Sequence, residues 1–302
     1  MTTTTTTYTR PAAFDMFDLD AIPAEHRDRV ADMIPSPVLA PVDEGRTSGY
    51  VTRTIDGLRC LDAFAVASDA EQNIILSGPT GAAKTMAFRA FAAVHRVPFA
   101  AINMNGGVDP NTFWGVTHTD IDSNADWTWT WTDAALVMMY GGVLLLDEVN
   151  MAHPRITAAF HSLLDDSWRF TVAERGITLH RHPASFVAAA LNPGYTGTAT
   201  LNQAFRRRFD HPITWGYEAD VESVLVPSES LLELARNLRE LPEVRTDVST
   251  AALCSFVRLA DVAGVEYAAA RFIDGFDPAE RGGVARAIEL HRDRIASELS
   301  AA

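Results

Sequence analysis

The sequence contains very little lysine. Among its 25 lysine and arginine residues, only Lys84 is a lysine. Arginine therefore fills the sites where either residue serves, and lysine remains where the two are not interchangeable. A phosphate-binding loop is such a site, because a slim ammonium on a flexible stem reaches phosphate oxygens that a planar guanidinium does not fit.

Cysteine is also scarce, and long apolar runs are missing. Cys60 and Cys254 lie far apart without metal-ligand spacing, which favours a reducing compartment, so we expect a cytoplasmic protein. The longest apolar stretch, 134–146, is too short to span a bilayer. The sequence starts with a threonine run rather than a charged head and an apolar core, so we expect no signal peptide.

Basic residues are in the minority. The chain has 39 acidic residues against 25 lysines and arginines, and its formal net charge is −14. This balance argues against passive coating of duplex DNA or of an anionic membrane, although it allows a local basic patch. With 302 residues, of which 47% are hydrophobic, the chain is long enough for one α/β domain plus a smaller domain.

The single lysine lies in a glycine-rich segment, Gly78-Pro79-Thr80-Gly81-Ala82-Ala83-Lys84-Thr85. The apolar run 73–77 before it predicts a buried strand, and the alanine-rich run 85–94 after it predicts a helix. A loop of this kind between a strand and a helix is the context in which backbone N–H groups bind nucleotide phosphates. The alternative, a glycine-rich turn without a ligand, is disfavoured because both flanks agree.

One position departs from the usual pattern of such loops, which have glycine directly before the lysine. Here that position is Ala83. Glycine lets the backbone approach a phosphate closely and adopt angles that other residues avoid. We therefore expect a nucleotide site that is weaker or slower than one with glycine.

A second group of candidate residues follows the apolar run 143–146. Asp147 and Glu148 stand at the end of a predicted parallel strand, where carboxylates project into the ligand crevice. We expect Asp147 to hold Mg²⁺ together with the Thr85 hydroxyl, and Glu148 to orient and deprotonate the attacking water. An acidic strand end is often only solvated, but this pair follows the loop by about 60 residues, which favours the catalytic interpretation.

Two further polar positions come later in the chain. Asn192 ends the predicted strand 186–191, where its amide is placed to position the water or the γ-phosphate; a simple turn is the alternative. The run Arg206-Arg207-Arg208 is either a solvated basic patch or the source of an arginine finger that acts on a neighbouring subunit.

The order of these motifs resembles the AAA+ ATPases, and most closely their MoxR branch with its CbbQ, NorQ and gas-vesicle GvpN relatives. The resemblance covers roughly residues 48–265, and a predicted hairpin at 169–182 lies where that branch places its pre-sensor hairpin. Its motifs are Gly78-Pro79-Thr80-Gly81, Leu146-Asp147-Glu148-Val149-Asn150 and Asn192-Pro193-Gly194-Tyr195.

The resemblance implies specific roles and partners. Asn192 resembles the sensor-1 residue, and Arg208, with Arg207 as the fallback, resembles the finger that acts in trans. ATP and Mg²⁺ are the implied cofactors, and we add Tyr50 and Val51 to the expected nucleotide contacts. A homo-oligomeric ring is implied, expected to be hexameric, which remodels or activates a client protein, often beside a partner with a von Willebrand A domain. The lid arginine of the family is missing, because Ser249-Thr250 is followed by Ala251.

The expected fold is α/β, with a three-layer P-loop NTPase core around a parallel sheet and a C-terminal all-helical lid. We expect a disordered segment and linker over 1–47, the ATPase core over 48–217 and the lid over 218–302. Further core strands are predicted at 98–104, 143–146, 186–191 and 213–215, and lid helices at 228–241, 250–263, 266–273 and 278–299.

Two other functions stay open. A nucleic-acid-handling motor is disfavoured by the acidic balance, whereas a slow ATP-gated scaffold is favoured by Ala83 and Ala251. Trp127, Trp129 and Trp131 alternate and so share one face of a predicted hairpin, where we expect packing rather than base stacking. We expect no association with a membrane.

Overall fold

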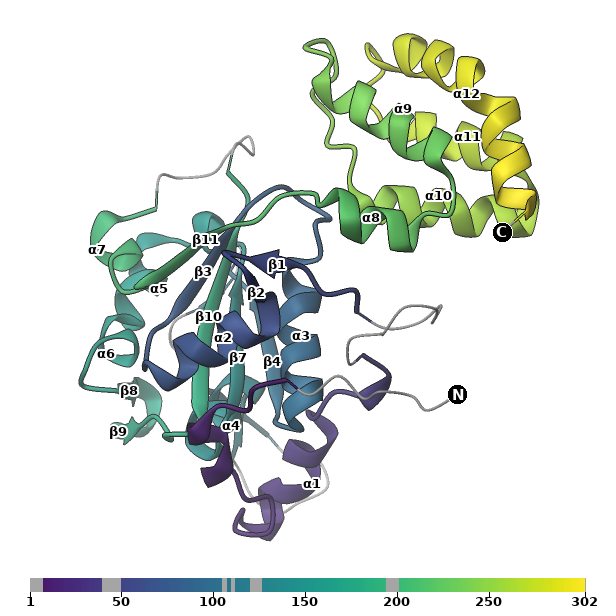
Figure 1. The fold of residues 1–302 in the computed structure, drawn as a ribbon. Coiled ribbons are helices and arrows are strands. Elements are labelled where there is room, and N and C mark those ends of the chain that lie inside the picture. The colour runs from purple at the N-terminus through teal and green to yellow at the C-terminus, as the bar shows by residue number, and fades with distance from the viewer. Residues whose placement is uncertain are drawn as a thin grey trace, which may run out of the picture. The chain divides into compact units, whose positions relative to one another are not determined.

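The computed structural model describes residues 8–39, 50–104, 108–109, 112–119, 127–193 and 201–301 (Figure 1). The chain forms two compact units. The core unit comprises Met1–Ser77 and Lys84–Thr214, and the helical unit comprises Gly78–Ala83 and Trp215–Ala302. The glycine-rich loop therefore belongs to the helical unit by its contacts, although its flanks belong to the core unit.

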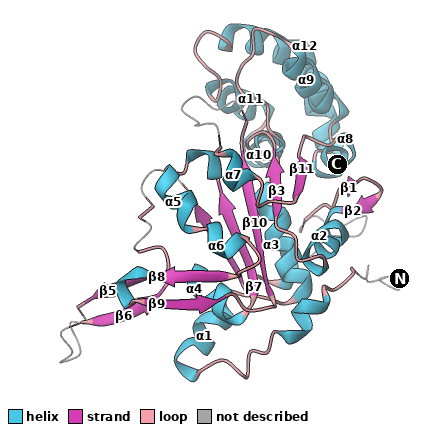
Figure 2. Ribbon diagram, turned by 90° about the vertical axis from the view of Figure 1, so that its left-hand side faces the viewer, coloured by secondary structure: helices cyan, strands magenta, loops and turns pink. Residues whose placement is uncertain are grey.

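A five-stranded parallel sheet forms the centre of the core unit (Figure 2). Its strands lie in the order β11-β3-β10-β7-β4, so β10, the fourth of the five along the chain, is inserted between β3 and β7. The inner strands are apolar because helices cover both of their faces. The five strands are β3 (Ile74–Ser77), β4 (Phe99–Asn103), β7 (Gly142–Asp147), β10 (Ser185–Leu191) and β11 (His211–Thr214).

Helices form the outer two layers. On one side, α3 (Lys84–His95) packs Phe91 against Phe186 of β10, with 5.8 Å between the ring centroids. The helix α2 (Cys60–Asp69) lies beside α3 and stacks Phe64 on Phe88. On the other side, Val187 of β10 lies in a cluster with residues of α4 (Asp133–Tyr140), α5 (Pro154–Ala159) and α6 (His161–Leu164). The three-layer α/β class predicted from the sequence is therefore confirmed.

The predicted hairpins are also present. The strands β5 (Gly115–His118) and β6 (Thr128–Trp131) pair antiparallel, as do β8 (Arg169–Val172) and β9 (Ile177–His180). A small ribbon of β1 (Thr54–Ile55) and β2 (Leu58–Arg59) precedes α2. The remaining elements of this unit are the 3₁₀ turns Ala12–Met16, Pro37–Leu39, Val149–Met151 and Ala173–Arg175 and the helices α1 (Ala24–Asp32) and α7 (Gln203–Arg206).

Part of the N-terminal region, which is expected to be a disordered segment and linker over 1–47, packs on other elements of the core unit. Phe14, in the first 3₁₀ turn, is fully buried and packs on Phe91 of α3. Arg29 of α1 forms an ion pair with Asp133 at 2.6 Å. Residues 8–39 therefore pack on the core unit, because their scattered apolar side chains find partners there. The threonine run at 2–7 lies outside the described residues, as do residues 40–49, which include the end of the segment expected over 1–47.

The helical unit has a core of its own. Its helices are α8 (Ala219–Leu225), α9 (Glu229–Glu240), α10 (Thr250–Ala263), α11 (Val265–Asp274) and α12 (Arg281–Ala301). Ser228 caps α9 and Ser249 caps α10, since each hydroxyl accepts a hydrogen bond from a backbone N–H two to three residues into the helix. Apolar side chains of α9 to α12 form one buried cluster. The predicted lid helices are thus present, and the unit begins at Trp215, shortly before residue 218.

No helix within the described ranges combines the length and the apolar character that crossing a bilayer requires.

Candidate functional site

The sheet order brings the predicted site residues of the core unit to one edge. The register pairs Leu191 of β10 with Ser77 of β3 and Asn103 of β4 with Asp147 of β7. Because parallel strands end on the same side, the residues that follow them meet at the carboxyl edge of the sheet (Figure 2). Asn192 therefore comes to lie between the start of α3 and the end of β7.

Lys84 is the first residue of α3 and is only 7% exposed. Its ammonium donates a hydrogen bond to Oδ1 of Asn192. The backbone oxygen of Asn192 in turn accepts a bond of 3.0 Å from Nδ2 of Asn150, which is itself buried. The lysine and the predicted sensor residue are therefore direct neighbours.

Thr85 and Asp147 are also in contact. The Thr85 hydroxyl donates to Oδ2 of Asp147 at 2.6 Å, and Oδ1 of the same carboxylate accepts the N–H of Glu148 at 3.0 Å. Nowhere in the described ranges do three or more His, Cys, Asp or Glu side chains form a metal-binding group. A Mg²⁺ ion that binds beside phosphates needs no such group, because it keeps several waters and takes one or two protein oxygens. The donor set of Thr85 and Asp147 fits that requirement.

Glu148 is held by a residue that the sequence analysis missed. Nδ2 of Asn103, at the end of β4, donates to Oε2 of Glu148 at 2.9 Å. Glu148 itself has a left-handed backbone with φ of 55°, which turns the chain sharply out of β7. A lone asparagine carries no motif, but its place at the end of the strand beside β7 identifies it once the sheet order is known.

The predicted finger residue, Arg208, is engaged within its own subunit. Its Nη1 donates to the carbonyl of Ala204 at 2.8 Å and its Nε to the carbonyl of His161 at 3.3 Å. Its own carbonyl accepts a bond of 2.9 Å from Nδ2 of the buried Asn73. Arg207 is exposed and, with Arg206, lines a pocket of about 310 Å³.

The loop Gly78–Ala83 shows why glycine is required at two of its positions. A Cβ on Gly78 would lie 1.6 Å from the carbonyl oxygen of Trp215. Gly81 has φ of +69°, and a Cβ there would lie 2.6 Å from Ser249. Both glycines therefore permit close packing of the loop within the helical unit.

Ala83 has a backbone conformation that glycine adopts more readily than alanine. Its φ is 63°, in the left-handed region that side chains with a Cβ rarely adopt. Such a conformation costs about 1 kcal/mol or more for alanine. Ala83 therefore adds local strain to the loop.

Tyr50 is buried in the core unit beside Cys60. Its ring is 4% exposed, and its hydroxyl lies 3.5 Å from Sγ of Cys60. Burial raises the pKa of Tyr50 well above its usual value, so the hydroxyl stays protonated. The expected nucleotide contact of Tyr50 and Val51 stays a prediction.

The three alternating tryptophans, Trp127, Trp129 and Trp131, differ in their environments. Trp129 and Trp131 are half-buried and meet edge to face at 5.4 Å, and the Arg175 guanidinium lies 5.6 Å from the Trp129 ring. These two residues pack on the core cluster, as expected. Trp127 is 73% exposed.

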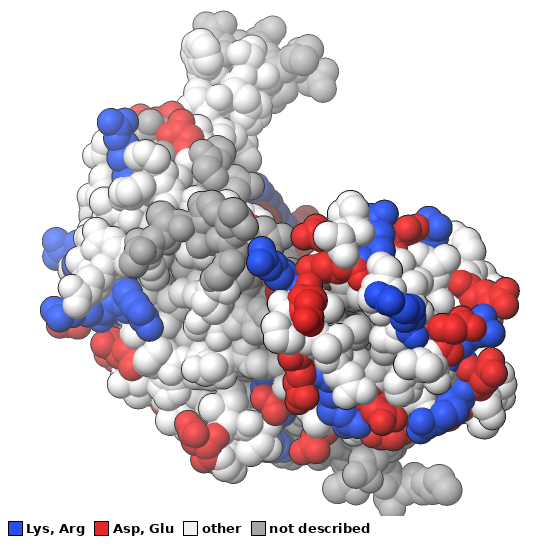
Figure 3. Space-filling model, turned by 90° about the horizontal axis from the view of Figure 1, so that it is seen from above, with Lys and Arg blue, Asp and Glu red and all other residues white. Residues whose placement is uncertain are grey.

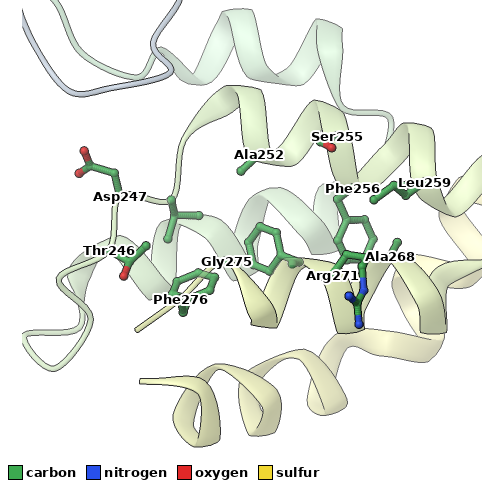
Figure 4. Close-up of a pocket in the computed structure, with 12 residues that line it drawn as sticks. Thr246, Asp247, Ala252, Ser255, Phe256, Leu259, Ala268, Arg271, Gly275 and Phe276 are labelled. Carbon is green, nitrogen blue, oxygen red and sulfur yellow. The ribbon is translucent and has the colours of Figure 1, made fainter. Parts of the chain in front are cut away.

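The helical unit also contains a small pocket of about 160 Å³ (Figure 4). Phe256, Phe272 and Phe276 supply much of its wall, and Asp247 and Arg271 contribute the charged groups. Arg271 pairs with Asp274 at 2.8 Å. The pocket is mainly apolar and therefore unlike a phosphate site.

The segment that contains the candidate site residues also matches a known protein family. Residues 73–209 match the family described as the AAA domain, dynein-related subfamily. An uncharacterized protein of Staphylococcus epidermidis is 26% identical over 238 residues, which cover 73% of this chain and 90% of that protein. An uncharacterized protein of Staphylococcus aureus is 26% identical over 184 residues, which cover 60% of this chain and 70% of that one.

A solved structure gives a looser match. The crystal structure of a "putative ATPase" from Cytophaga hutchinsonii aligns over 75% of this chain and 78% of that chain, with a TM-score of 0.46 and 15% identity. This similarity is too low to add to the fold described above.

The matched segment contains the motifs of the candidate site. It begins one residue before β3 and ends at Phe209, and so includes the loop, Asp147, Glu148 and Asn192. The MoxR branch stays a prediction, since the match names a different subfamily. Residues 73–209 are therefore similar to the AAA domains of that family.

Proposed function

We propose that this protein is a ring-forming AAA+ ATPase that uses ATP binding and hydrolysis to remodel or activate a client protein. The observation that carries the proposal is the cluster at the carboxyl edge of the sheet. There Lys84 contacts Asn192, and Thr85 contacts Asp147, whose chain neighbour is Glu148.

The binding residues follow from their chemistry. The N–H groups of the loop bind the phosphates, and the loop runs directly into Lys84, whose ammonium neutralises the β- and γ-phosphate oxygens. Thr85 and Asp147 would hold Mg²⁺, which would neutralise charge on the phosphates. The hydrogen bond from Lys84 to Asn192 is then exchanged for one to phosphate.

Hydrolysis needs a base and a guide for the water. Glu148 accepts the proton of the attacking water as the oxygen of that water bonds to the γ-phosphorus and the bond to ADP breaks. Asn103 fixes the carboxylate through Oε2, so that Oε1 is the oxygen left to take the proton. Asn192 orients the water or the γ-phosphate.

Assembly completes the proposed site. We infer a homo-oligomeric ring, expected to be hexameric and cytoplasmic, in which Arg208 or Arg207 of one subunit acts on the nucleotide of the next. The exposure of Arg207 beside the 310 Å³ pocket supports a role for this region at a subunit boundary. The client is proposed to be a protein, with a von Willebrand A domain partner as the family resemblance implies.

The slow ATP-gated scaffold is the second candidate. The strained backbone of Ala83 favours it, because strain in the loop weakens phosphate binding. The nucleic-acid motor has less support. On the face shown in Figure 3, basic and acidic side chains of the described residues are interspersed, whereas a nucleic-acid channel needs a continuous basic surface.

Steady-state phosphate release tests the proposal. The wild-type protein with ATP and Mg²⁺ should release phosphate, and Glu148→Gln should bind ATP without doing so. Tight ATP binding with equal, negligible turnover in both proteins would favour the scaffold. Stimulation by single-stranded DNA, without any effect of a protein client, would favour the motor.

A further inference from the structure

The helical unit holds three consecutive carbonyl groups of the glycine-rich loop. The Tyr217 hydroxyl donates to the carbonyl of Thr80 at 2.9 Å. The backbone N–H of Ala251 donates to the carbonyl of Gly81 at 3.3 Å, and the indole N–H of Trp215 donates to the carbonyl of Ala82 at 2.7 Å. Each successive peptide of the loop is thus bound on its oxygen side.

Binding these oxygens sets the direction of the N–H groups. In a planar trans peptide, the N–H of one residue points opposite to the carbonyl of the residue before it. The N–H groups of Gly81, Ala82 and Ala83 are therefore turned away from the three donors. Within the described residues, no group accepts a hydrogen bond from these three N–H groups. Adjacent N–H groups that share a direction are suited to bind an anion.

A buried ion pair supports the first of these donors. The Arg239 guanidinium lies over the Tyr217 ring, 4.2 Å from its centroid. Glu222, which is 3% exposed, accepts both Nη atoms of Arg239, at 2.7 and 2.9 Å. Burial alone would raise the pKa of Glu222, but hydrogen bonds from Arg239 and Thr250 outweigh it and lower that pKa. The pair is therefore charged at neutral pH.

The same network reaches the second donor. The Thr250 hydroxyl donates to Glu222 at 2.6 Å, and Nε of Arg239 donates to the carbonyl of Val248 at 2.8 Å. These bonds fix the chain on both sides of Ser249, the cap of α10, and so place the N–H of Ala251. The helical unit thus offers a backbone N–H at the position where the family has an arginine side chain.

The hydroxyl of Tyr217 is suited to a permanent donor role. Burial and the nearby Asp247 carboxylate raise its pKa, so it stays protonated over the working pH range. Removing its oxygen leaves the ring free to keep its contact with Arg239. The variant Tyr217→Phe therefore isolates one hydrogen bond to the loop.

We infer that Tyr217 and Trp215 are positioning residues that turn the N–H groups of the loop toward the nucleotide phosphates before the nucleotide binds. The inference rests on the proposed nucleotide site. It adds that part of the phosphate affinity comes from residues outside the matched AAA segment, which ends at residue 209.

The test separates binding of the phosphates from binding of the adenosine part of the nucleotide. A fluorescent ADP analogue is displaced by ADP, by inorganic pyrophosphate and by adenosine, in the wild type and in Tyr217→Phe. A hydrogen bond contributes about 0.5–1.5 kcal/mol, so ADP and pyrophosphate should each bind roughly threefold to tenfold more weakly in the variant. Adenosine should bind equally to both proteins.

Turnover adds a readout that a purely structural role would not move. If Tyr217 only prepares phosphate binding, KM for ATP should rise by the same factor while kcat stays unchanged. Trp215→Phe should behave in the same way, because it removes the indole donor and keeps an aromatic ring. Tyr267→Phe, in the same unit and half-exposed beside Arg271, is the matched control and should change neither constant.

Several results would overturn the inference. One is unchanged pyrophosphate affinity in both Tyr217→Phe and Trp215→Phe. Another is a loss of affinity confined to ADP and adenosine, which would place Tyr217 beside the adenine base of the nucleotide. A third is an equal loss in Tyr267→Phe, which would show a general effect on the helical unit. A wild-type protein that binds no nucleotide would instead refute the proposed function.

Discussion

The ammonium of Lys84 and the amide oxygen of Asn192 are hydrogen-bonded to each other at the carboxyl edge of the sheet. Lys84 follows β3 through the loop, and Asn192 follows β10 directly. The two residues meet, although they are distant in sequence, because β10 lies next to β3 in the sheet. A phosphate group that binds Lys84 must displace this amide or share the ammonium with it. The proposed phosphate contact of Lys84 would therefore alter the hydrogen bonding of Asn192.

Replacing Lys84 tests the centre of the proposed site. Lys84→Ala should abolish measurable ATP binding, because it removes the cation that the loop places against the β- and γ-phosphates. The expected measurement is calorimetric titration with ATP and Mg²⁺, alongside thermal melting without nucleotide. Arg89→Ala is the matched control, since Arg89 is an exposed cation on the same helix. Equal ATP affinity in Lys84→Ala and the wild type would refute the assignment.

Replacing Glu148 separates binding from chemistry. Glu148→Gln keeps the shape of the side chain, and its amide oxygen can still accept the hydrogen bond from Asn103. The amide does not take a proton from water, so turnover should fall about 100-fold or more while ATP binding is retained. Phosphate release and calorimetry on the same preparation check both parts. Unchanged turnover would place the base at another residue.

The fold was predictable where burial leaves a simple trace in the sequence. Runs such as Val143 to Leu146 are apolar at every position because both faces of the strand are covered, and β7 appears where that pattern predicts. The order of the strands is not encoded locally. It depends on which apolar faces pair across long distances, so only the structure shows β10 between β3 and β7.

The candidate site was predictable where a motif names its residues. Lys84, Thr85, Asp147, Glu148 and Asn192 meet as expected because each stands at the end of a strand or the start of a helix. Asn103, Trp215 and Tyr217 were missed, since a single polar or aromatic residue has many possible environments. Their roles follow from the register of β4 and from the packing of the loop within the helical unit, which no local pattern predicts.

The proposed arginine finger predicts that activity depends on assembly. Arg208→Ala should lower turnover about 1,000-fold or more with ATP binding retained, as loss of a trans-acting finger does. Mixing it with the equally inactive Lys84→Ala should restore part of the turnover, because each subunit supplies what its neighbour lacks. Phosphate release by the mixture, with mixed assembly verified by a tag on one variant, is the measurement.

The internal bonds of Arg208 make the comparison with its neighbours informative. Its guanidinium donates to the carbonyls of Ala204 and His161, whereas Arg207 is exposed. Arg207→Ala and Arg206→Ala are therefore made in parallel. A loss confined to Arg207→Ala would transfer the finger to that residue. If mixed assemblies with Lys84→Ala stay inactive for both Arg207→Ala and Arg208→Ala, neither arginine acts on the nucleotide of a neighbouring subunit.

The left-handed backbone of Ala83 makes Ala83→Gly the last test. Glycine adopts a φ of 63° without steric cost, so the variant should relieve about 1 kcal/mol of strain in the folded loop. Glycine also makes the unfolded chain more flexible, which opposes folding by about 0.4–1 kcal/mol. The two effects nearly cancel in the free energy of unfolding, so the melting temperature without nucleotide should change by no more than a few degrees.

The gain from Ala83→Gly should appear instead in the nucleotide site, as tighter ATP binding or faster turnover, because a loop without the Ala83 methyl approaches the phosphates more closely. Calorimetry, phosphate release and melting of the two proteins are compared side by side. The control is Ala159→Gly at an exposed position of α5, which reports the ordinary cost of glycine in a helix. If Ala83→Gly leaves both affinity and turnover at the wild-type values, the loop already accommodates alanine, and the slow scaffold loses its main support.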